Sequence, residues 1–399
     1  CVILTPELTR CGNYNSLVGT VDSSSIYRDL CAVVSCSGLI ERIMERKMSP
    51  KKVFVAMSGG VDSSVTAARL IEQGYDVTGV MLKLWKANHT IENSEAPESK
   101  AREVASILGI PFMVMDAQEI FHQKIVNYFL EAHRKGITPN PCFVCNATIK
   151  WGMLLDYVLE AGGEYLATGH YARVKLGENS SFELWQGSDP QKDQSYVLAG
   201  LTQHQLSHAL LPLGEITKSQ TREIARRYGL GFQDVKESQD LCFLSGWDQN
   251  LFLKNYSPDL FMPGEIISAE GKVVGSHTGL ANYTIGQRKG IGSGFKEPFY
   301  VLYKENSKNQ LIVGAKKDLG QRQVKIRDIN WISGEEPSLP ASFQVKIRYK
   351  ANPVSATLRK NNANECDMIF NQFVRDPTPG QYAVFYQGGQ VIGSGVISI

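Results

Sequence analysis

The sequence lacks the features that mark several large classes of protein. No run of 18 apolar residues occurs among its 399 residues, so we expect neither a membrane-spanning helix nor a membrane partner. Eight cysteines are far too few for a disulfide scaffold of this length. The charges nearly cancel, with 42 Lys and Arg against 40 Asp and Glu, so the net charge gives no sign of a nucleic-acid partner.

The residues that are present have the composition of a folded globular chain, and the length predicts two or three domains. Residues 1–49 differ from the rest, because they are rich in Ser and Cys and show no clear hydrophobic period. We expect them to be a poorly ordered extension of a cytoplasmic protein. The alternative is the remnant of a mitochondrial or plastid transit peptide, although such peptides are usually poor in acidic residues.

From residue 51 the sequence alternates between short apolar runs and amphipathic segments. The runs at 53–57, 77–82 and 112–115 predict strands, and the segments at 62–73, 98–108 and 118–134 predict helices. This order predicts an α/β fold with a doubly wound parallel sheet, in a catalytic domain of residues 50–243. Short strands with glycine turns then predict a small central β domain at 244–318 and a C-terminal β-barrel at 319–399.

A turn rich in glycine and serine joins the first predicted strand to the first predicted helix. Its sequence is Ser58-Gly59-Gly60-Val61-Asp62-Ser63-Ser64. Glycines let backbone N–H groups approach an anion closely. The helix N-terminus adds the positive end of the helix dipole, and the serine hydroxyls add hydrogen-bond donors. The turn is not a Walker A motif, because no Gly-Lys-Ser/Thr follows. It matches the pyrophosphate loop of ATP pyrophosphatases, with Asp62 available to cap the helix or to bind Mg²⁺.

Three cysteines lie in two separate turns. Cys142 and Cys145 form a Cys-x-x-Cys beside two prolines, ahead of a helix predicted from about residue 147, and Cys242 lies close to Asp240. We expect a lowered pKa for Cys145, because it lies near a helix N-terminus. Cys366 lies in a remote segment that we predict to be an exposed turn, so a four-cysteine zinc site has no support and we expect no resident metal ligands. Free cysteines are otherwise most often small buried hydrophobic residues.

Six motifs together resemble the tRNA-specific 2-thiouridylases, which use ATP to replace O2 of the wobble uridine, position 34, with sulfur. They lie at residues 58–64, 139–146, 167–173, 192–196, 238–243 and 283–290, and the resemblance runs from about residue 51 to residue 399. The resemblance implies that the cofactors are ATP and Mg²⁺. The residues that it implies for ATP binding are Ala56, Met57, Ser58, Gly59, Gly60, Val61, Asp62, Ser63, Leu82 and Gly169.

The resemblance also implies the sulfur chemistry. Uracil O2 is adenylated, sulfur arrives from a donor protein as a persulfide on Cys242, and Cys145 releases it, which leaves AMP, PPi and a transient disulfide. Cys142 stands where many members have Asp as a general acid/base, and a thiol pKa of about 8.5 rather than about 4 puts that role in doubt. The three cysteines could instead hold a [4Fe–4S] cluster that carries hydrosulfide. We favour the persulfide relay, because thiolate attack needs no further cofactor.

For the tRNA anticodon loop the resemblance implies a set of contact residues. They are Asn140, Pro141, Cys142, His170, Lys192, Asp193, Gln194, Arg348, Tyr349 and Gln381. Lys218 and the arginines of the same predicted helix form either a further tRNA face or a solvated one. A monomer is expected. Two other functions stay open, a ligase that uses the same ATP chemistry with a nitrogen nucleophile and a tRNA-binding module without catalysis.

Overall fold

The computed structural model describes residues 50–85, 97–231, 241–244, 246–291, 298–362 and 364–398. The chain divides into two units, Cys1–Pro50 and Lys51–Ile399, and only the second is described below. The predicted extension and Asp240 therefore lie outside the described residues.

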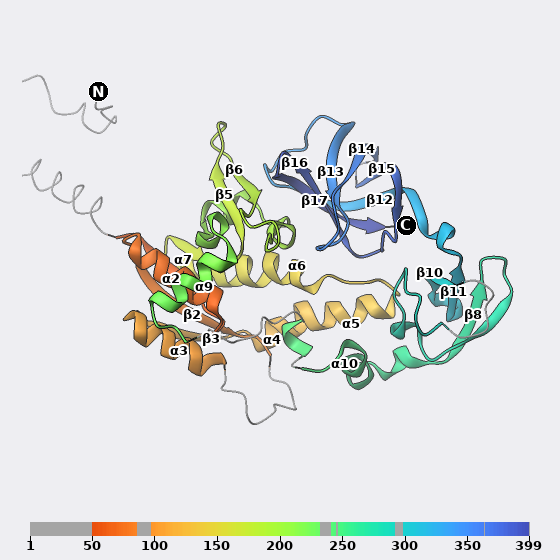
Figure 1. The fold of residues 1–399 in the computed structure, drawn as a ribbon, viewed down its shortest axis with the longest axis horizontal. Helices are drawn as coiled ribbons and strands as arrows, with labels where there is room; N and C mark the ends of the chain where they lie inside the picture. The colour runs from red at the N-terminus through yellow and green to blue at the C-terminus, as the bar shows by residue number, and fades with distance from the viewer. Residues whose placement is uncertain are drawn as a thin grey trace, which may run out of the picture. The chain divides into compact units, whose positions relative to one another are not determined.

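The first domain is built on a five-stranded sheet with the order β3-β2-β1-β4-β7 (Figure 1). Its strands are β1 (Lys52–Ala56), β2 (Asp76–Lys83), β3 (Phe112–Asp116), β4 (Tyr165–Ala167) and β7 (Ala209–Leu210). All neighbours are parallel. The chain passes from β1 to β2 and β3 on one side and resumes with β4 on the other, so the direction of winding changes between β1 and β4. Doubly wound sheets bind their ligands at such a switch point.

Helices lie between these strands and after the last of them. They are α2 (Val61–Glu72), α3 (Pro97–Leu108), α4 (Gln118–Phe121), α5 (Asn127–Arg134), α6 (Pro141–Cys145), α7 (Leu155–Glu160), α8 (Gln203–Ser207), α9 (Lys218–Arg227) and α10 (Gln249–Tyr256). The π-helical segments η2 (His122–Val126) and η3 (Asn146–Leu154) join α4 to α5 and α6 to α7. In α2 the residues Val65, Ala67 and Leu70 are buried against Val53 and Val55 of β1.

The helix that carries the paired cysteines begins earlier than the sequence predicts. It starts at Pro141 rather than near residue 147, and the Asn140 side chain caps it by accepting a hydrogen bond from the Phe143 N–H, at 3.1 Å. The prediction was wrong because proline, which disfavours helix before and around it, is well suited to the first helical position. Cys142 and Cys145 therefore lie inside the helix.

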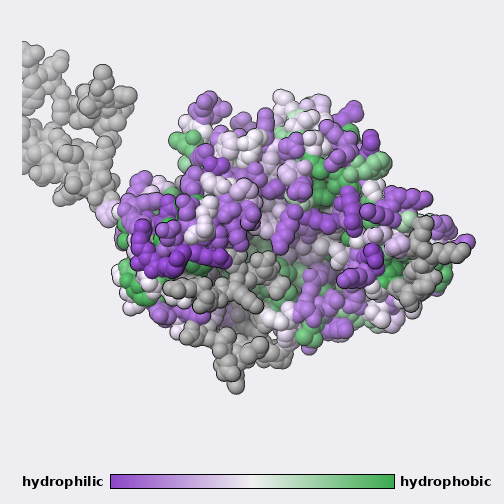
Figure 2. Space-filling view, in the orientation of Figure 1, coloured by the Kyte–Doolittle hydropathy of each residue, from purple (hydrophilic) through white to green (hydrophobic). Residues whose placement is uncertain are grey.

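The continuous helix Pro141–Glu160 is long and apolar enough, by length and composition, to cross a membrane. A core helix of a water-soluble protein passes the same test, and here Phe143, Trp151, Leu155 and Val158 belong to the main core cluster. On the face drawn in Figure 2, hydrophilic side chains dominate and hydrophobic ones form small separate patches.

The predicted β domains follow. A four-stranded sheet with the order β10-β11-β8-β9 forms the central one, and strands β12 to β17 form the last one, closed by pairing of β12 with β17. The bounds are β8 (Gly264–Ser268), β9 (Val273–His277), β10 (Tyr300–Glu305), β11 (Gln310–Gly314), β12 (Gly320–Trp331), β13 (Ala341–Lys346), β14 (Val354–Asn362), β15 (Glu365–Arg375), β16 (Tyr382–Gln387) and β17 (Gln390–Ser398). The predicted fold class is confirmed.

The sequence did not predict the short strands β4 and β7 of the parallel sheet, nor two strand regions of the last sheet. The hairpin of β5 (Ala172–Leu176) and β6 (Phe182–Gln186) leaves the first domain and pairs with β17, so it extends the barrel sheet. Strand β15 contains Cys366, which is buried in the barrel core and not in an exposed turn. Its alternation is hard to recognise, because the outward positions mix polar residues with the exposed Ile369 and Phe373.

Candidate active site

The glycine-rich loop follows β1 and opens α2 at the switch point of the sheet. Gly59 has a φ of 74°, which favours glycine, and lets the chain turn sharply after the strand. Gly60 is the N-cap of α2 and has no side chain that could cap the first-turn amides. Such amides form an anion site at a helix N-terminus. The hydroxyl groups of Ser63 and Ser64 both donate to the Gly60 carbonyl and brace the loop, at 3.0 and 2.9 Å.

Gly169 brings a second segment against this loop. It follows β4, and a Cβ placed on it would lie 2.8 Å from the Asp62 carbonyl carbon and 2.9 Å from the Ser63 nitrogen. Only glycine allows the two backbones to approach this closely. The structure therefore brings the predicted residues 56–63 and Gly169 together. Leu82 lies at the carboxyl end of β2, at the same edge of the sheet, and is half-buried.

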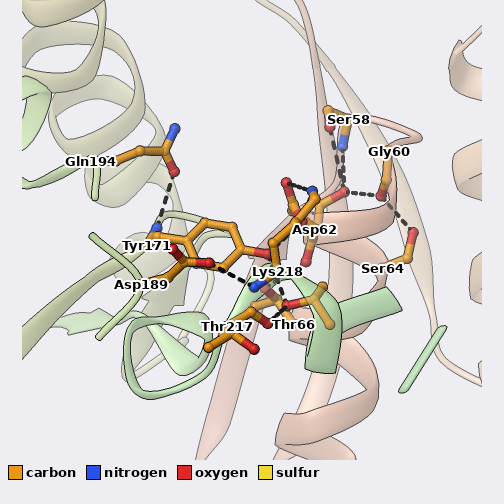
Figure 3. A network of polar contacts seen from close by, with 12 residues as sticks. Ser58, Gly60, Asp62, Ser64, Thr66, Tyr171, Asp189, Gln194, Thr217 and Lys218 are labelled. Atoms are coloured by element: carbon orange, nitrogen blue, oxygen red, sulfur yellow. Dashed lines mark hydrogen bonds and ion pairs between the residues drawn. The ribbon is translucent and has the colours of Figure 1, made fainter. Parts of the chain in front are cut away.

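Asp62 is the centre of a polar network (Figure 3). Its two carboxylate oxygens accept hydrogen bonds from the Lys218 ammonium, at 2.6 and 2.8 Å, and the Tyr171 hydroxyl donates to the same carboxylate at 2.9 Å. Lys218 is buried. The expectation that Lys218 belongs to an exposed basic face was wrong, because this residue is the first of α9 and points into the protein toward the loop.

The cysteines differ in their surroundings, and among the described residues all four are free thiols. Cys145 is buried among apolar side chains that include Phe121 and Phe243, and this burial raises the pKa of its thiol to about 12. The predicted lowering was wrong, because the helix begins at Pro141, four residues before Cys145, and the surroundings of Cys145 are apolar. Cys142 and Cys242 are both in contact with solvent. Protein atoms nevertheless surround much of each thiol group, and the resulting loss of solvation raises the pKa of both thiols.

Lys150 opposes the effect of burial on the pKa of all three thiols. The sequence did not predict this role for Lys150. Its positive charge lowers the pKa of Cys142, Cys145 and Cys242, although burial outweighs it in each case. Lys150 lies in η3, five residues after Cys145 and eight after Cys142 on one continuous helix. That spacing was visible in the sequence, but it becomes informative only once the helix is known to begin at Pro141.

Replacing Lys150 by Met should slow the alkylation of Cys142 and Cys242. The substitution removes a charge that lowers both pKa values, and below the pKa the thiolate fraction falls about tenfold for each unit by which the pKa rises. The difference should close at pH values above both pKa values. Iodoacetamide labelling followed by mass spectrometry from about pH 6 to about pH 11 measures it. Lys124→Met, which removes an exposed charge from η2, is the control, and equal rates for Lys150→Met and wild type at every pH would contradict the expectation.

The fit of a [4Fe–4S] cluster can be judged from the placement of the ligands. Within the described ranges, no group of three His, Cys, Asp or Glu side chains is placed to hold a metal ion. Cys142, Cys145 and Cys242 lie in those ranges. As they are arranged in this structure, the three cysteines do not fit a cluster.

The C-terminal barrel holds the turn that precedes the cysteine helix. The Gln381 amide donates to the Thr138 and Pro139 carbonyls, both at 3.1 Å. Tyr382 stacks on Phe143, with ring centroids 3.6 Å apart and an interplanar angle of 13°. Gln381 thus has a structural role in positioning the cysteine helix, and its contact with tRNA stays a prediction.

Several other predicted tRNA contacts serve the fold. Asp193 is buried and accepts hydrogen bonds from Lys346, from Gln186 and from two backbone N–H groups, which leaves its carboxylate inside the protein. His170 is also buried, which lowers its pKa well below the usual range, and its Nδ1 lies 2.6 Å from the Thr168 hydroxyl. A neutral, satisfied histidine does not attract phosphate by charge.

The remaining predicted contacts are more open to solvent. The Gln194 side chain accepts a hydrogen bond from the Tyr171 N–H at 3.0 Å, and Lys192 is half-buried in the same turn. Arg348 bonds the carbonyl of Asp376, and Tyr349 is exposed with its ring 6.1 Å from that of Tyr196. No contact of these residues with tRNA is tested by the structure, so all of them stay predictions.

Three family models match the chain in order. They are described as the tRNA methyl transferase HUP domain (residues 51–246), the tRNA methyl transferase PRC-barrel domain (250–315) and the aminomethyltransferase beta-barrel domain (321–397). The tRNA-specific 2-thiouridylase MnmA of Magnetococcus marinus is 43% identical over 356 residues, which cover 87% of this chain and 99% of that protein. The chain belongs to the tRNA-specific 2-thiouridylase family. The MnmA of Carboxydothermus hydrogenoformans is 42% identical and covers 87% of the chain and 97% of its own length.

Membership of the 2-thiouridylase family makes the chain a tRNA-uridine sulfurtransferase. The methyl-transfer wording belongs to the domain descriptions, whereas the nearly full-length relatives are named as thiouridylases. Among solved structures, the U34-tRNA thiolase NcsA from Methanococcus maripaludis with its [4Fe–4S] cluster is 16% identical. It matches with a TM-score of 0.31 over 52% of this chain and 67% of that one. At that TM-score the likeness has no bearing on the sulfur chemistry of this 2-thiouridylase.

Proposed function

We propose that this protein uses ATP and Mg²⁺ to adenylate O2 of the wobble uridine of tRNA and then replaces that oxygen with sulfur from a cysteine persulfide. The observation that carries the proposal is that the domain with the glycine-rich loop at its switch point also holds three free thiols, with Cys145 packed against Phe243, the residue that follows Cys242. One domain thereby combines a site for a triphosphate with nucleophilic sulfur. Both are needed, because uracil O2 is a poor leaving group until it becomes part of AMP.

The first step belongs to the glycine-rich loop. The α2 amides and the loop serines would hold the ATP phosphates while the uracil O2 attacks the α-phosphorus and PPi leaves. Mg²⁺ is usually bound by one or two carboxylates together with phosphate oxygens, and Asp62 is the carboxylate of this loop. Both Asp62 oxygens already accept hydrogen bonds from Lys218, at 2.6 and 2.8 Å, so phosphate oxygens would supply most of the Mg²⁺ ligands, with Asp62 beside the ion. The residues fit Mg²⁺ in that arrangement, and the ion would neutralise charge on the leaving PPi.

The second step belongs to the cysteines. A donor protein with a persulfide transfers its outer sulfur to Cys242, which is exposed and accessible to it. The Cys145 thiolate then attacks the Cys242 sulfur and forms a disulfide, and the outer sulfur leaves as hydrosulfide. Hydrosulfide adds to C2 of the adenylated uracil, AMP leaves with the original oxygen, and a two-electron thiol reductant restores both cysteines.

Mass spectrometry of tRNA nucleosides tests this function. The full chain is incubated with tRNA, ATP, Mg²⁺ and a persulfide donor, and we expect 2-thiouridine at position 34 together with AMP and PPi. Omission of ATP should abolish the product. Absence of a 2-thio product with the donor, and also with sulfide after anaerobic purification, would overturn the proposal. Stoichiometric iron and sulfide that activity requires would overturn the persulfide step alone.

A further inference from the structure

The nucleotide loop contains a negative charge where it should bind a negatively charged ligand. Asp62 is the second residue of α2, in the turn whose amides form the anion site. A carboxylate and a triphosphate at such short range repel each other unless a cation lies between or beside them. A cation is present, because the Lys218 ammonium contacts both Asp62 oxygens, at 2.6 and 2.8 Å.

Lys218 is fixed by the elements around it. It is the first residue of α9, and its backbone N–H donates to the Asp189 carboxylate at 3.0 Å. The preceding Thr217 forms a capping box with Gln220, which fixes the start of the helix. The Lys218 side chain is only 7% exposed, so its ammonium is withdrawn from solvent and held beside Asp62.

Tyr171 fixes the carboxylate from another direction. Its hydroxyl donates to Asp62 Oδ1 at 2.9 Å and lies 2.8 Å from the Thr221 hydroxyl of α9. Figure 3 shows Lys218 and Tyr171 on one side of Asp62, and Ser58 and Gly60 on the other. Two segments that are far from Asp62 in the sequence, at Tyr171 and at Lys218, thus contact one carboxylate and hold it toward α9.

We propose that Lys218 is a positioning residue of the nucleotide site that acts through Asp62. By neutralising the Asp62 carboxylate and holding it toward α9, Lys218 lets the loop accept a triphosphate. Lys218 itself does not need to touch the phosphates in this role. The inference rests on the proposed use of ATP and adds a residue that is 156 positions from the loop in the sequence.

Nucleotide titration calorimetry on the full chain tests the role. Lys218→Met should weaken ATP binding about tenfold, ADP binding less and AMP binding least, because repulsion from an unpaired carboxylate grows with the charge of the ligand. In an Asp62→Asn background the same substitution should change ATP affinity less than about twofold, because no carboxylate charge is left to neutralise. Lys218→Arg should restore part of the affinity.

The other outcomes separate this role from its alternatives. An equal loss in both backgrounds would overturn the inference in favour of direct contact between Lys218 and phosphate. Equal losses for ATP, ADP and AMP would overturn it in favour of a general defect, which thermal unfolding would reveal. Lys135→Met, which removes an exposed charge, is the control for net charge. If the wild-type protein binds no ATP, both this inference and the proposed function are overturned. If the wild-type protein binds ATP and Lys218→Met binds it with the same affinity, only this inference is overturned.

Discussion

Replacing Cys145 by Ser should lower 2-thiouridine formation at least about a thousandfold while tRNA-dependent release of PPi from ATP continues. A serine hydroxyl cannot attack a persulfide to form a disulfide, so hydrosulfide is not released. The proposed adenylation uses the glycine-rich loop and needs no thiol, so its products should still appear. The substitution thus separates the two proposed half-reactions.

The measurement follows thiouridine by mass spectrometry and PPi by a coupled assay in the same samples. Cys242→Ser should lose thiolation in the same way. Cys366→Ser is the matched control, because Cys366 is the fourth free cysteine of the described chain and is buried in the barrel. If Cys145→Ser and Cys242→Ser both form the wild-type amount of product, cysteine chemistry is excluded and a nitrogen nucleophile becomes the better explanation.

The burial of Cys145 adds a condition to this chemistry. A thiol with a pKa of about 12 is ionised to about one part in 100,000 at pH 7. Cys145 is therefore protonated in the structure described. Its apolar neighbours include Phe121 and Phe243, and Phe243 directly follows Cys242. In the proposed mechanism, sulfur delivery to Cys242 would therefore take place next to the packing that raises the pKa of Cys145.

Features set by local sequence were predicted well. The alternation of strands and helices gave the doubly wound sheet, and the seven-residue loop lies where the switch point requires it, because both depend on neighbouring residues. The surroundings of the site were not predictable in the same way. The contact between Lys218 and Asp62 and the burial of Cys145 by Phe243 depend on segments that meet only in the folded chain.

The cysteine helix shows a different kind of failure. Two prolines suggested extended chain through residue 146, but Pro141 occupies the first helical position and Asn140 caps the helix. That difference of about six residues moved Cys145 from a predicted helix terminus into the apolar interior and hid the relation of Lys150 to the thiols. The role of Gln381 was likewise invisible, because it depends on how the barrel contacts the turn at Thr138.

Gly169→Ala should weaken ATP binding about a hundredfold without unfolding the protein. An added Cβ would lie 2.8 Å from the Asp62 carbonyl carbon and 2.9 Å from the Ser63 nitrogen, and these are backbone atoms that no rotamer change can move away. Either the loop or the segment after β4 must shift, and a displacement near 1 Å of a positioning group costs about a hundredfold in reaction rate. We expect a loss of the same order in ATP affinity, because the displaced loop amides are the ones that would bind the phosphates.

Calorimetric titration with ATP measures the loss, and circular dichroism with thermal unfolding reports whether the fold survives. Gly275→Ala is the matched control, because a Cβ there would meet its nearest neighbour, the Ile266 side chain, at an ordinary 3.7 Å. Unchanged ATP affinity in Gly169→Ala would mean that the loop does not need its contact with the β4 segment. A hundredfold loss with an intact fold would instead make the approach of Gly169 to Asp62 a condition of nucleotide binding. It would also connect the motif at residues 58–64 with the motif at residues 167–173 through one backbone contact.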